Sequence, residues 1–185
     1  MKTSMIWVAL WCSALAATAA AETPAQTHSC VACHGNAGVS DNPEWPSLAG
    51  QNAAYLEQQI TAFRDGEREN PPMKPFVENL SDAEIAELAE YYADQEAVAT
   101  ANGDPALVDT GRQLAGYCSA CHGYAGRPAT DEWPVLAGQH AAYLELQLLS
   151  FKRGERIQPL MQAAVGKLSA KEFAALAAYY SQLQP

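Results

Sequence analysis

The sequence predicts an all-α fold made of two tandem, duplicated domains. Segments 30–92 and 118–180 align without a gap at an offset of 88 residues, and more than half of the aligned positions are identical. Within both segments, apolar residues recur at helical spacing, and the alternating pattern typical of strands is missing. An offset of 88 residues is far longer than the unit of a solenoid, so it indicates two small duplicated domains.

The first 21 residues predict a secretory signal peptide. Lys2 precedes an apolar run over 5–15, and small residues follow up to the expected cleavage site after Ala21. The run is too short to anchor the chain in a membrane. Cys12 would suggest a lipoprotein, but the bulky Trp11 before it argues against that class. No other stretch is apolar enough to span a membrane, so we expect a soluble, exported protein.

The mature chain divides into a first domain over 22–98 and a second domain over 99–185. The segment 93–104 is the expected linker between them, because it contains an Asn-Gly-Asp turn sequence and no apolar periodicity. A domain of this size has a thin apolar core when it folds alone. Each domain therefore needs an additional apolar centre.

The predicted helices follow in chain order. A helix is expected over 53–64, where apolar residues recur at helical spacing. Capping boxes of the form Ser-x-x-Glu at 81–84 and 169–172 each begin another helix, and an i, i+3, i+4, i+7 apolar stripe follows each box. Segment 105–117 reads as a helix that leads into the second domain. Its counterpart before Cys30 is cut short by the signal peptide, so that helix is expected to be stunted or absent.

Each domain carries one Cys-x-x-Cys-His motif, at 30–34 and at 118–122. This motif is the attachment signature of a c-type haem. Two thiols three residues apart lie on one side of a helical turn, where they can add to the two vinyl groups along a porphyrin edge. The next residue can then bring an imidazole onto the iron. The motifs assign Cys30, Cys33, Cys118 and Cys121 to two covalent haems, and His34 and His122 to the two irons.

Paired cysteines also have three uses other than haem attachment. Two Cys-x-x-Cys pairs can form a tetrahedral zinc site, two local disulfides or a thioredoxin-like redox couple. A zinc site has no need of a histidine directly after each second cysteine, and a redox couple has no need of a repeat. The haem interpretation is favoured, and it uses all four cysteines of the mature chain.

The second axial ligand of each iron is predicted by elimination. The mature chain contains two methionines, Met73 and Met161, which are 88 residues apart and follow proline-bearing segments, and both are expected to lie in loops. A thioether is a soft ligand suited to haem iron, although a methionine can equally be a filler of the core. Neither His28 nor His140 has a histidine at the position 88 residues away in the other domain, so bis-histidine ligation is disfavoured. Both are expected to be ordinary surface or cap residues.

Charge is distributed unequally between the two domains. Residues 22–98 contain 14 acidic and 3 basic side chains, whereas residues 99–185 contain 7 of each. Such asymmetry orients the encounter with a charged partner, and so acidic a chain is a poor ligand for nucleic acid. Carboxylates favour ferric iron, so the haem on His34 is expected to have the lower reduction potential.

These features together resemble a dihaem cytochrome c of the cytochrome c₄ type. The resemblance rests on the two haem motifs, the Leu-Ala-Gly-Gln segments at 48–51 and 136–139, the two late methionines and the Ser-x-x-Glu helices. It covers nearly all of the mature chain. It implies two cytochrome c-like domains that each enclose one low-spin haem, with the haem edges facing each other. It also implies that the carbonyls of Pro46 and Pro134 hold the iron-binding histidines.

The resemblance further implies a periplasmic electron-transfer protein, not an enzyme. Its redox partners would be a membrane haem-copper oxidase and an upstream quinol-oxidising complex, and the protein itself would be a monomer. The alternative is the haem subunit of a periplasmic oxidoreductase, such as a flavocytochrome sulfide dehydrogenase. A peroxidase needs an open iron position, which two methionine ligands would block.

Two further pairs of residues have open roles. Trp45 and Trp133 fit as walls of the haem pockets, although a buried aromatic side chain needs no functional role. Arg68 and Arg156 can pair with haem propionates or be solvated surface arginines.

Overall fold

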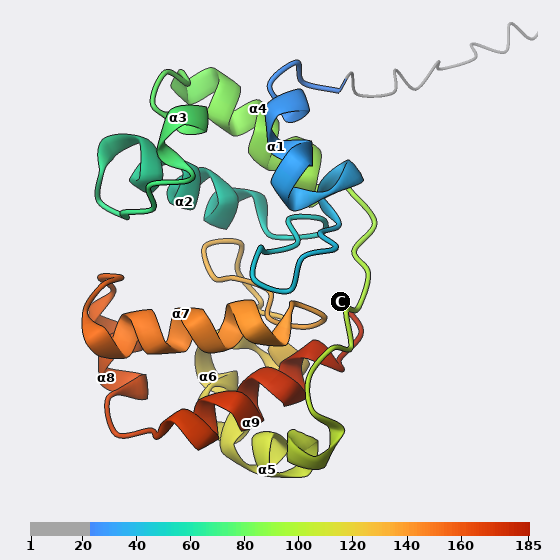
Figure 1. The fold of residues 1–185 in the computed structure, drawn as a ribbon, viewed down its shortest axis with the longest axis vertical. Coiled ribbons are helices and arrows are strands. Elements are labelled where there is room, and N and C mark those ends of the chain that lie inside the picture. The colour runs from blue at the N-terminus through green and yellow to red at the C-terminus, as the bar shows by residue number, and fades with distance from the viewer. Residues whose placement is uncertain (1–22) are drawn as a thin grey trace, which may run out of the picture.

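The computed structural model describes residues 23–185, so the predicted signal peptide lies outside the described residues. Every regular element within this range is helical, as the sequence predicted. The helices form two domains stacked along the long axis of the molecule (Figure 1). The segment between the last helix of domain one and the first helical turn of domain two runs along one side of the stack (Figure 1).

Domain one contains four α-helices and one short 3-10 helix. They are α1 (Thr27–His34), η1 (Asn36–Gly38), α2 (Ala53–Asp65), α3 (Lys74–Val77) and α4 (Asp82–Ala93). Helix α2 ends at Gly66, whose φ of 80° is a left-handed conformation that glycine adopts without strain. Helix α4 begins with the predicted capping box, in which Ser81 and Glu84 bond each other's backbone N–H groups.

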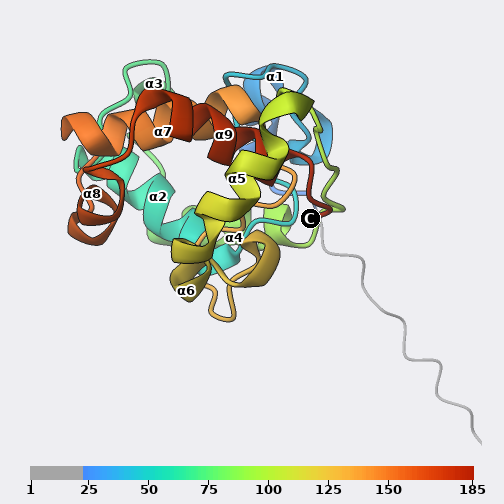
Figure 2. The same ribbon diagram turned by 90° about the horizontal axis from the view of Figure 1, so that it is seen from below.

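Domain two repeats this order and adds helices before the motif. It contains η2 (Pro105–Leu107), α5 (Val108–Leu114), η3 (Ala115–Tyr117), α6 (Ser119–His122), η4 (Tyr124–Gly126), α7 (Ala141–Arg153), α8 (Pro159–Val165) and α9 (Ala170–Ser181). The helix predicted over 105–117 is thus a succession of three short helices. Seen from below, α5, α7 and α9 lie in front of domain one (Figure 2).

Each core forms where the last helix of a domain packs on that domain's 13-residue helix, α2 or α7. In domain one α4 packs on α2, and the buried residues of the predicted stripe are Ile85, Leu88, Ala89 and Tyr92. In domain two α9 packs on α7 and also on α5. Gly111 of α5 makes that second crossing possible, since a Cβ there would lie 2.0 Å from the carbonyl oxygen of Ala175.

The two domains meet through a pseudo-two-fold interface whose members are 88 residues apart. The side chain of Gln51 accepts from Val135 N–H at 2.8 Å and donates to Val135 O at 3.0 Å. The side chain of Gln139 makes the matching pair with Ser47, at 2.9 and 2.8 Å. These glutamines end the two Leu-Ala-Gly-Gln segments, so the repeated motif ties each domain to the backbone of the other.

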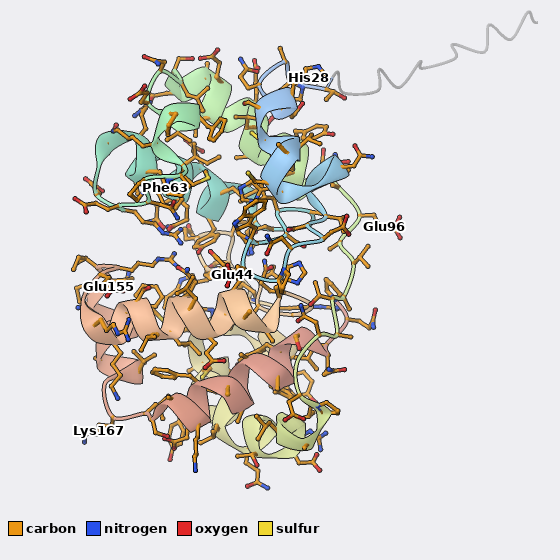
Figure 3. All side chains as sticks on the ribbon, in the orientation of Figure 1. His28, Glu44, Phe63, Glu96, Glu155 and Lys167 are labelled. Atoms are coloured by element: carbon orange, nitrogen blue, oxygen red, sulfur yellow. The ribbon has the colours of Figure 1, made fainter. Side chains whose placement is uncertain are left out.

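A second set of symmetric contacts joins α2 to α7. Its members are Tyr55 and Tyr143, Gln59 and Gln147, and Arg68 and Arg156. Arg68 donates to Gln59 Oε1 at 2.8 Å and to Gln147 Oε1 at 2.7 Å, and Arg156 donates to the same two oxygens at 2.7 and 2.8 Å. Each guanidinium also stacks on its own domain's phenylalanine. Figure 3 shows Phe63 and Glu155 on opposite sides of this boundary.

These contacts correct one of the two interpretations of the arginines, because neither is a solvated surface residue. Burial alone would raise the pKa of the Tyr143 hydroxyl, but Arg68 and Arg156 lower it below its ordinary value. Within residues 23–185 no helix is both long and apolar enough to cross a bilayer.

Candidate haem sites

The two motifs lie at the ends of α1 and α6, and in each domain the backbone turns sharply after the histidine. His34 ends α1 and His122 ends α6, and both side chains are buried. The next residue, Gly35 or Gly123, has a φ of 76° or 71°. A Cβ at either glycine would lie within 1.8 Å of a carbonyl oxygen in the following loop, so only glycine fits there.

The imidazole rings are oriented by proline carbonyls, as the resemblance implied. His34 Nδ1 lies 2.9 Å from Pro46 O, and His122 Nδ1 lies 3.4 Å from Pro134 O. A carbonyl only accepts, so Nδ1 carries the proton and Nε2 keeps its lone pair. Burial lowers the pKa of both histidines, against the opposing effect of the proline carbonyls, and so favours the neutral ring that binds iron.

The buried Nε2 of His122 has no hydrogen-bond partner in the described structure. An unpaired polar atom in an apolar interior costs free energy unless it binds something. A lone pair aimed into an apolar region beside two thiols has the chemistry of an axial haem ligand. The residues of this site therefore fit a covalently held haem.

No disulfide joins any of the four cysteines within the described residues, which excludes the alternative of two local disulfides. Cys30 and Cys118 are half-buried, and burial raises the pKa of both thiols despite nearby hydroxyls of Tyr92 and Tyr180 that lower it. Among residues 23–185, no three His, Cys, Asp or Glu side chains gather as a metal-binding group. The zinc alternative therefore lacks its ligand cluster.

The two methionines occupy related but unequal positions. Met73 is the N-cap of α3, while Met161 lies inside α8, which corrects the expectation that both are in loops. The reason is local: Gln158 accepts the N–H of Leu160 at 2.8 Å, and Pro159 begins the helix, so α8 starts before the methionine. Both helices lie at the same end of their domains, beside the turn that follows α2 or α7 (Figure 1).

The remaining histidines differ from each other. His28 is exposed, as expected. His140 is the N-cap residue of α7, as one of the two expectations had it, but it is 5% exposed and joins the domains, so it is not a surface residue. Its Nε2 lies 2.8 Å from Ser40 O in domain one, and its Nδ1 lies 2.7 Å from Asn102 Nδ2 in the linker. No pattern in the sequence indicates this role, because Asn52 stands at the matching position.

The tryptophans are also unequal. Trp133 stands edge-on to the ring of His122, with centroids 5.8 Å apart. Trp45 is 41% exposed. Trp133 thus packs directly on an imidazole of the candidate site, whereas Trp45 exposes much of its surface to solvent.

Comparison with known proteins agrees with this geometry. Residues 16–91 match the family described as cytochrome c oxidase, cbb3-type, subunit III, and residues 108–184 match the family described as cytochrome c. Cytochrome c4 of Pseudomonas aeruginosa is 38% identical over 182 residues, covering 91% of this chain and 90% of the relative. The thiosulfate dehydrogenase electron acceptor of Thiomonas intermedia is 36% identical, covering 80% of this chain and 73% of the relative.

The structure agrees as well. The crystal structure of reduced cytochrome c4 from Pseudomonas stutzeri superposes with a TM-score of 0.79 at 32% identity, and the match covers 85% of this chain and 96% of that one. Two c-type haem domains in tandem, at this level of identity over most of the chain, establish the family. The chain belongs to the dihaem cytochrome c4 family of electron-transfer proteins.

Proposed function

We propose that each domain holds its haem through the residues that the sequence assigned. Cys30 and Cys33, and likewise Cys118 and Cys121, form the thioether bonds, and His34 and His122 bind the irons. Met73 and Met161 are the opposite ligands. The observation that carries this proposal is the buried, unpartnered Nε2 of His122, whose Nδ1 faces the carbonyl of Pro134.

The bound haem supplies a one-electron couple between ferrous and ferric iron. The chain's own residues set the conditions for that couple. The proline carbonyls hold a proton on Nδ1 and so direct Nε2. A methionine opposite a histidine raises the reduction potential. With a histidine and a methionine both bound, each iron would have no open position for a substrate, so the proposed role is that of an electron carrier and not of an enzyme.

The proposed role is periplasmic transfer of single electrons between respiratory proteins. The predicted signal peptide over 1–21 directs export, and the electrons pass from a quinol-oxidising complex to a membrane haem-copper oxidase. The proposed domain boundary at 98/99 is supported by Thr100, whose N–H donates to Gly138 O of domain two at 3.0 Å. Charge asymmetry between the domains supports the orientation of such encounters.

Substitution of the methionines tests the ligand assignment. Met161→His should keep a six-coordinate iron but lower that haem's potential by a sizeable part of the roughly 0.8 V range that axial ligands cover. Met73→His should do the same for the other haem. Redox titration followed by absorbance measures both. Unchanged potentials, together with an unchanged Met-to-iron absorbance band in the ferric proteins, would show that the methionines are not ligands.

Intact mass tests the attachment. The mature protein should weigh the polypeptide plus two haems, and a variant with Cys30→Ala and Cys33→Ala should lose one of them. A polypeptide mass without haem would contradict the proposal.

A second candidate is the redox subunit of an oxidoreductase. The relative from Thiomonas intermedia, named as the electron acceptor of a thiosulfate dehydrogenase, favours it. In that case the catalytic centre would lie in a separate protein and these haems would receive its electrons. Reduction of the purified protein by such a dehydrogenase with its substrate, and not by a quinol-oxidising complex, would favour this candidate. Absorbance that changes on adding cyanide or peroxide would instead indicate an open iron.

A further inference from the structure

Two tyrosines beside the second haem motif project into solvent. Tyr117 is 93% exposed and Tyr124 is 92% exposed, which makes them the most exposed of the large apolar side chains in the described residues. Tyr117 ends η3 and Tyr124 begins η4, and both of these short helices contact α6, which carries the motif. Cys121, between them in sequence, is also exposed. Both tyrosines are therefore exposed close to the second motif in sequence, one residue before Cys118 and two residues after His122.

Domain one lacks this pair. At the offset of 88 residues, Ser29 stands in place of Tyr117 and Asn36 in place of Tyr124. The same contrast recurs before the methionine. Ile157 and Leu160 are 66% and 63% exposed, while their counterparts are Glu69 and Pro72. At these four matching positions, domain two thus exposes a larger apolar side chain than domain one.

Packing within the chain does not explain these tyrosines. A side chain that is more than nine-tenths exposed contributes almost nothing to its own core, so the packing of domain two requires neither tyrosine. Tyrosine is enriched among the residues that dominate binding energy at protein interfaces. Electron transfer also requires the partner's redox centre to come close to the haem, so a surface beside the attachment motif is where contact is useful.

The charges decide what kind of partner fits. Domain one has 14 acidic and 3 basic residues within 22–98, so it attracts basic surfaces and repels acidic ones. Domain two has 7 of each within 99–185 and repels neither. A partner with an acidic or uncharged rim therefore approaches this molecule with domain two in front.

We propose that the tyrosine surface, defined as Tyr117 and Tyr124, is where the electron acceptor docks. The acceptor is a redox protein whose docking surface is apolar at its centre and acidic or uncharged at its rim. One electron passes from this protein to an oxidised haem or copper centre of the acceptor, so that one iron here becomes ferric as the acceptor is reduced. This inference rests on the proposed function, because it takes the membrane haem-copper oxidase as the acceptor.

Exchange of residues between the domains tests the proposal. The holoprotein with Tyr117→Ser and Tyr124→Asn should keep both haems, its absorbance spectrum and its potentials, because the replaced side chains are exposed. Its rate of oxidation by membranes that contain the haem-copper oxidase should fall by about ten-fold at low protein concentration, as expected for the loss of binding hot spots. The matched control, Ser29→Tyr with Asn36→Tyr, should be oxidised at the wild-type rate.

Salt gives an independent readout. Raising the ionic strength should leave the oxidation rate unchanged or increase it, because any residual repulsion is screened. A steep fall with salt would overturn the proposal, since it would indicate a basic acceptor that docks on domain one. An undiminished rate in the double tyrosine variant would overturn the tyrosine surface alone. Failure of the wild type to be oxidised would instead overturn the proposed direction of electron flow, and the acceptor named here with it.

Discussion

Domains one and two present their motifs in the same way but secure the chain before the motif differently. In both, a buried histidine faces a proline carbonyl and a glycine turns the chain. In domain two, α5 reaches the motif by packing across α9. In domain one, the described chain has a single helix, α1, before the turn, and Gln26 ties it to Glu84 of α4 by a bond of 2.7 Å. The residues that the two domains share thus orient the haem-binding histidine, whereas the segments that differ stabilise the chain before the motif.

The interface shows the same division. Paired glutamines, tyrosines and arginines make equivalent bonds in both directions, as expected of an isologous contact between duplicated halves. His140 and Asn52 break the equivalence. Asn52 donates to Trp133 O at 2.6 Å, while His140 contacts Ser40 O and the linker residue Asn102. Of these two residues, only His140 therefore contacts the linker.

The largest expected effect concerns α5, which domain one lacks. Gly111→Ala places a methyl group against the carbonyl oxygen of Ala175, and backbone on both sides leaves little room to relax. We expect the free energy of unfolding of domain two to fall by about 3 kcal/mol, the upper end for overpacking. Urea unfolding of the holoprotein measures it.

Gly116→Ala is the matched control for this change. No atom lies within 4 Å of a Cβ built at Gly116, so this variant should be as stable as the wild type or slightly more so. Equal stability of the two alanine variants would show that a methyl group fits between α5 and α9, contrary to the close contact at Gly111.

The next effect breaks the asymmetric contact of the interface. Asn102 Oδ1 accepts the N–H of Ala141 at 2.9 Å, so its amide nitrogen must donate to His140 Nδ1, and His140 Nε2 must donate to Ser40 O. His140→Ala leaves the buried carbonyl of Ser40 unpaired and removes the partner of the Asn102 amide, which should cost about 2 kcal/mol. His140→Asn, which copies domain one, should recover part of that loss. Identical stability of the two variants would contradict a hydrogen-bonding role.

A smaller effect separates the two potentials. The haem on His34 lies in the domain with 14 acidic and 3 basic residues, so its ferric form should be favoured and its potential lower. Most of these charges are exposed and screened over about 8 Å at physiological salt. The difference should therefore be tens of millivolts, where about 59 mV is a tenfold change for one electron.

Met161→His shifts one of the two steps and so assigns both. A lower potential for the haem on His122 in the wild type, or a difference that ignores ionic strength, would contradict the electrostatic explanation. The predicted order implies that electrons enter at domain one and leave from domain two.

The sequence predicted the fold and both motifs because these depend on local patterns. The helical stripes and the capping boxes are each visible within one stretch of chain, and the offset of 88 residues is visible when two stretches are compared. The roles of Gln51 and His140 were beyond it, since their partners lie 84 and 100 residues away and are backbone groups that carry no sequence signal. The sequence does not predict the helix around Met161, because a proline is typical of a loop but also fits the first position of a helix, and Pro159 begins α8.

The smallest expected effect compares the two capping boxes. In each, the glutamate accepts from the N–H and hydroxyl of its serine, but Glu84 also accepts from Gln26. Glu84→Ala should therefore destabilise its domain more than Glu172→Ala destabilises the other. Adding Gln26→Ala should cost less in the Glu84→Ala background than in the wild type, because their bond is already lost.

The same bonds predict a difference with pH. The N–H of Ser81, its hydroxyl and Gln26 lower the pKa of Glu84 below its ordinary 4.5, and the two groups of Ser169 lower that of Glu172. A carboxyl with a lowered pKa contributes its full stability above 4.5 and loses it as pH falls through the folded-state value. Domain one should thus lose more stability than domain two from this source below pH 4.5, and Gln26→Ala should reduce the difference. The free energy of unfolding, measured at several values below pH 4.5, tests this prediction. Equal losses of stability in the wild type and in Gln26→Ala would show that the bond between Gln26 and Glu84 does not act through the carboxylate.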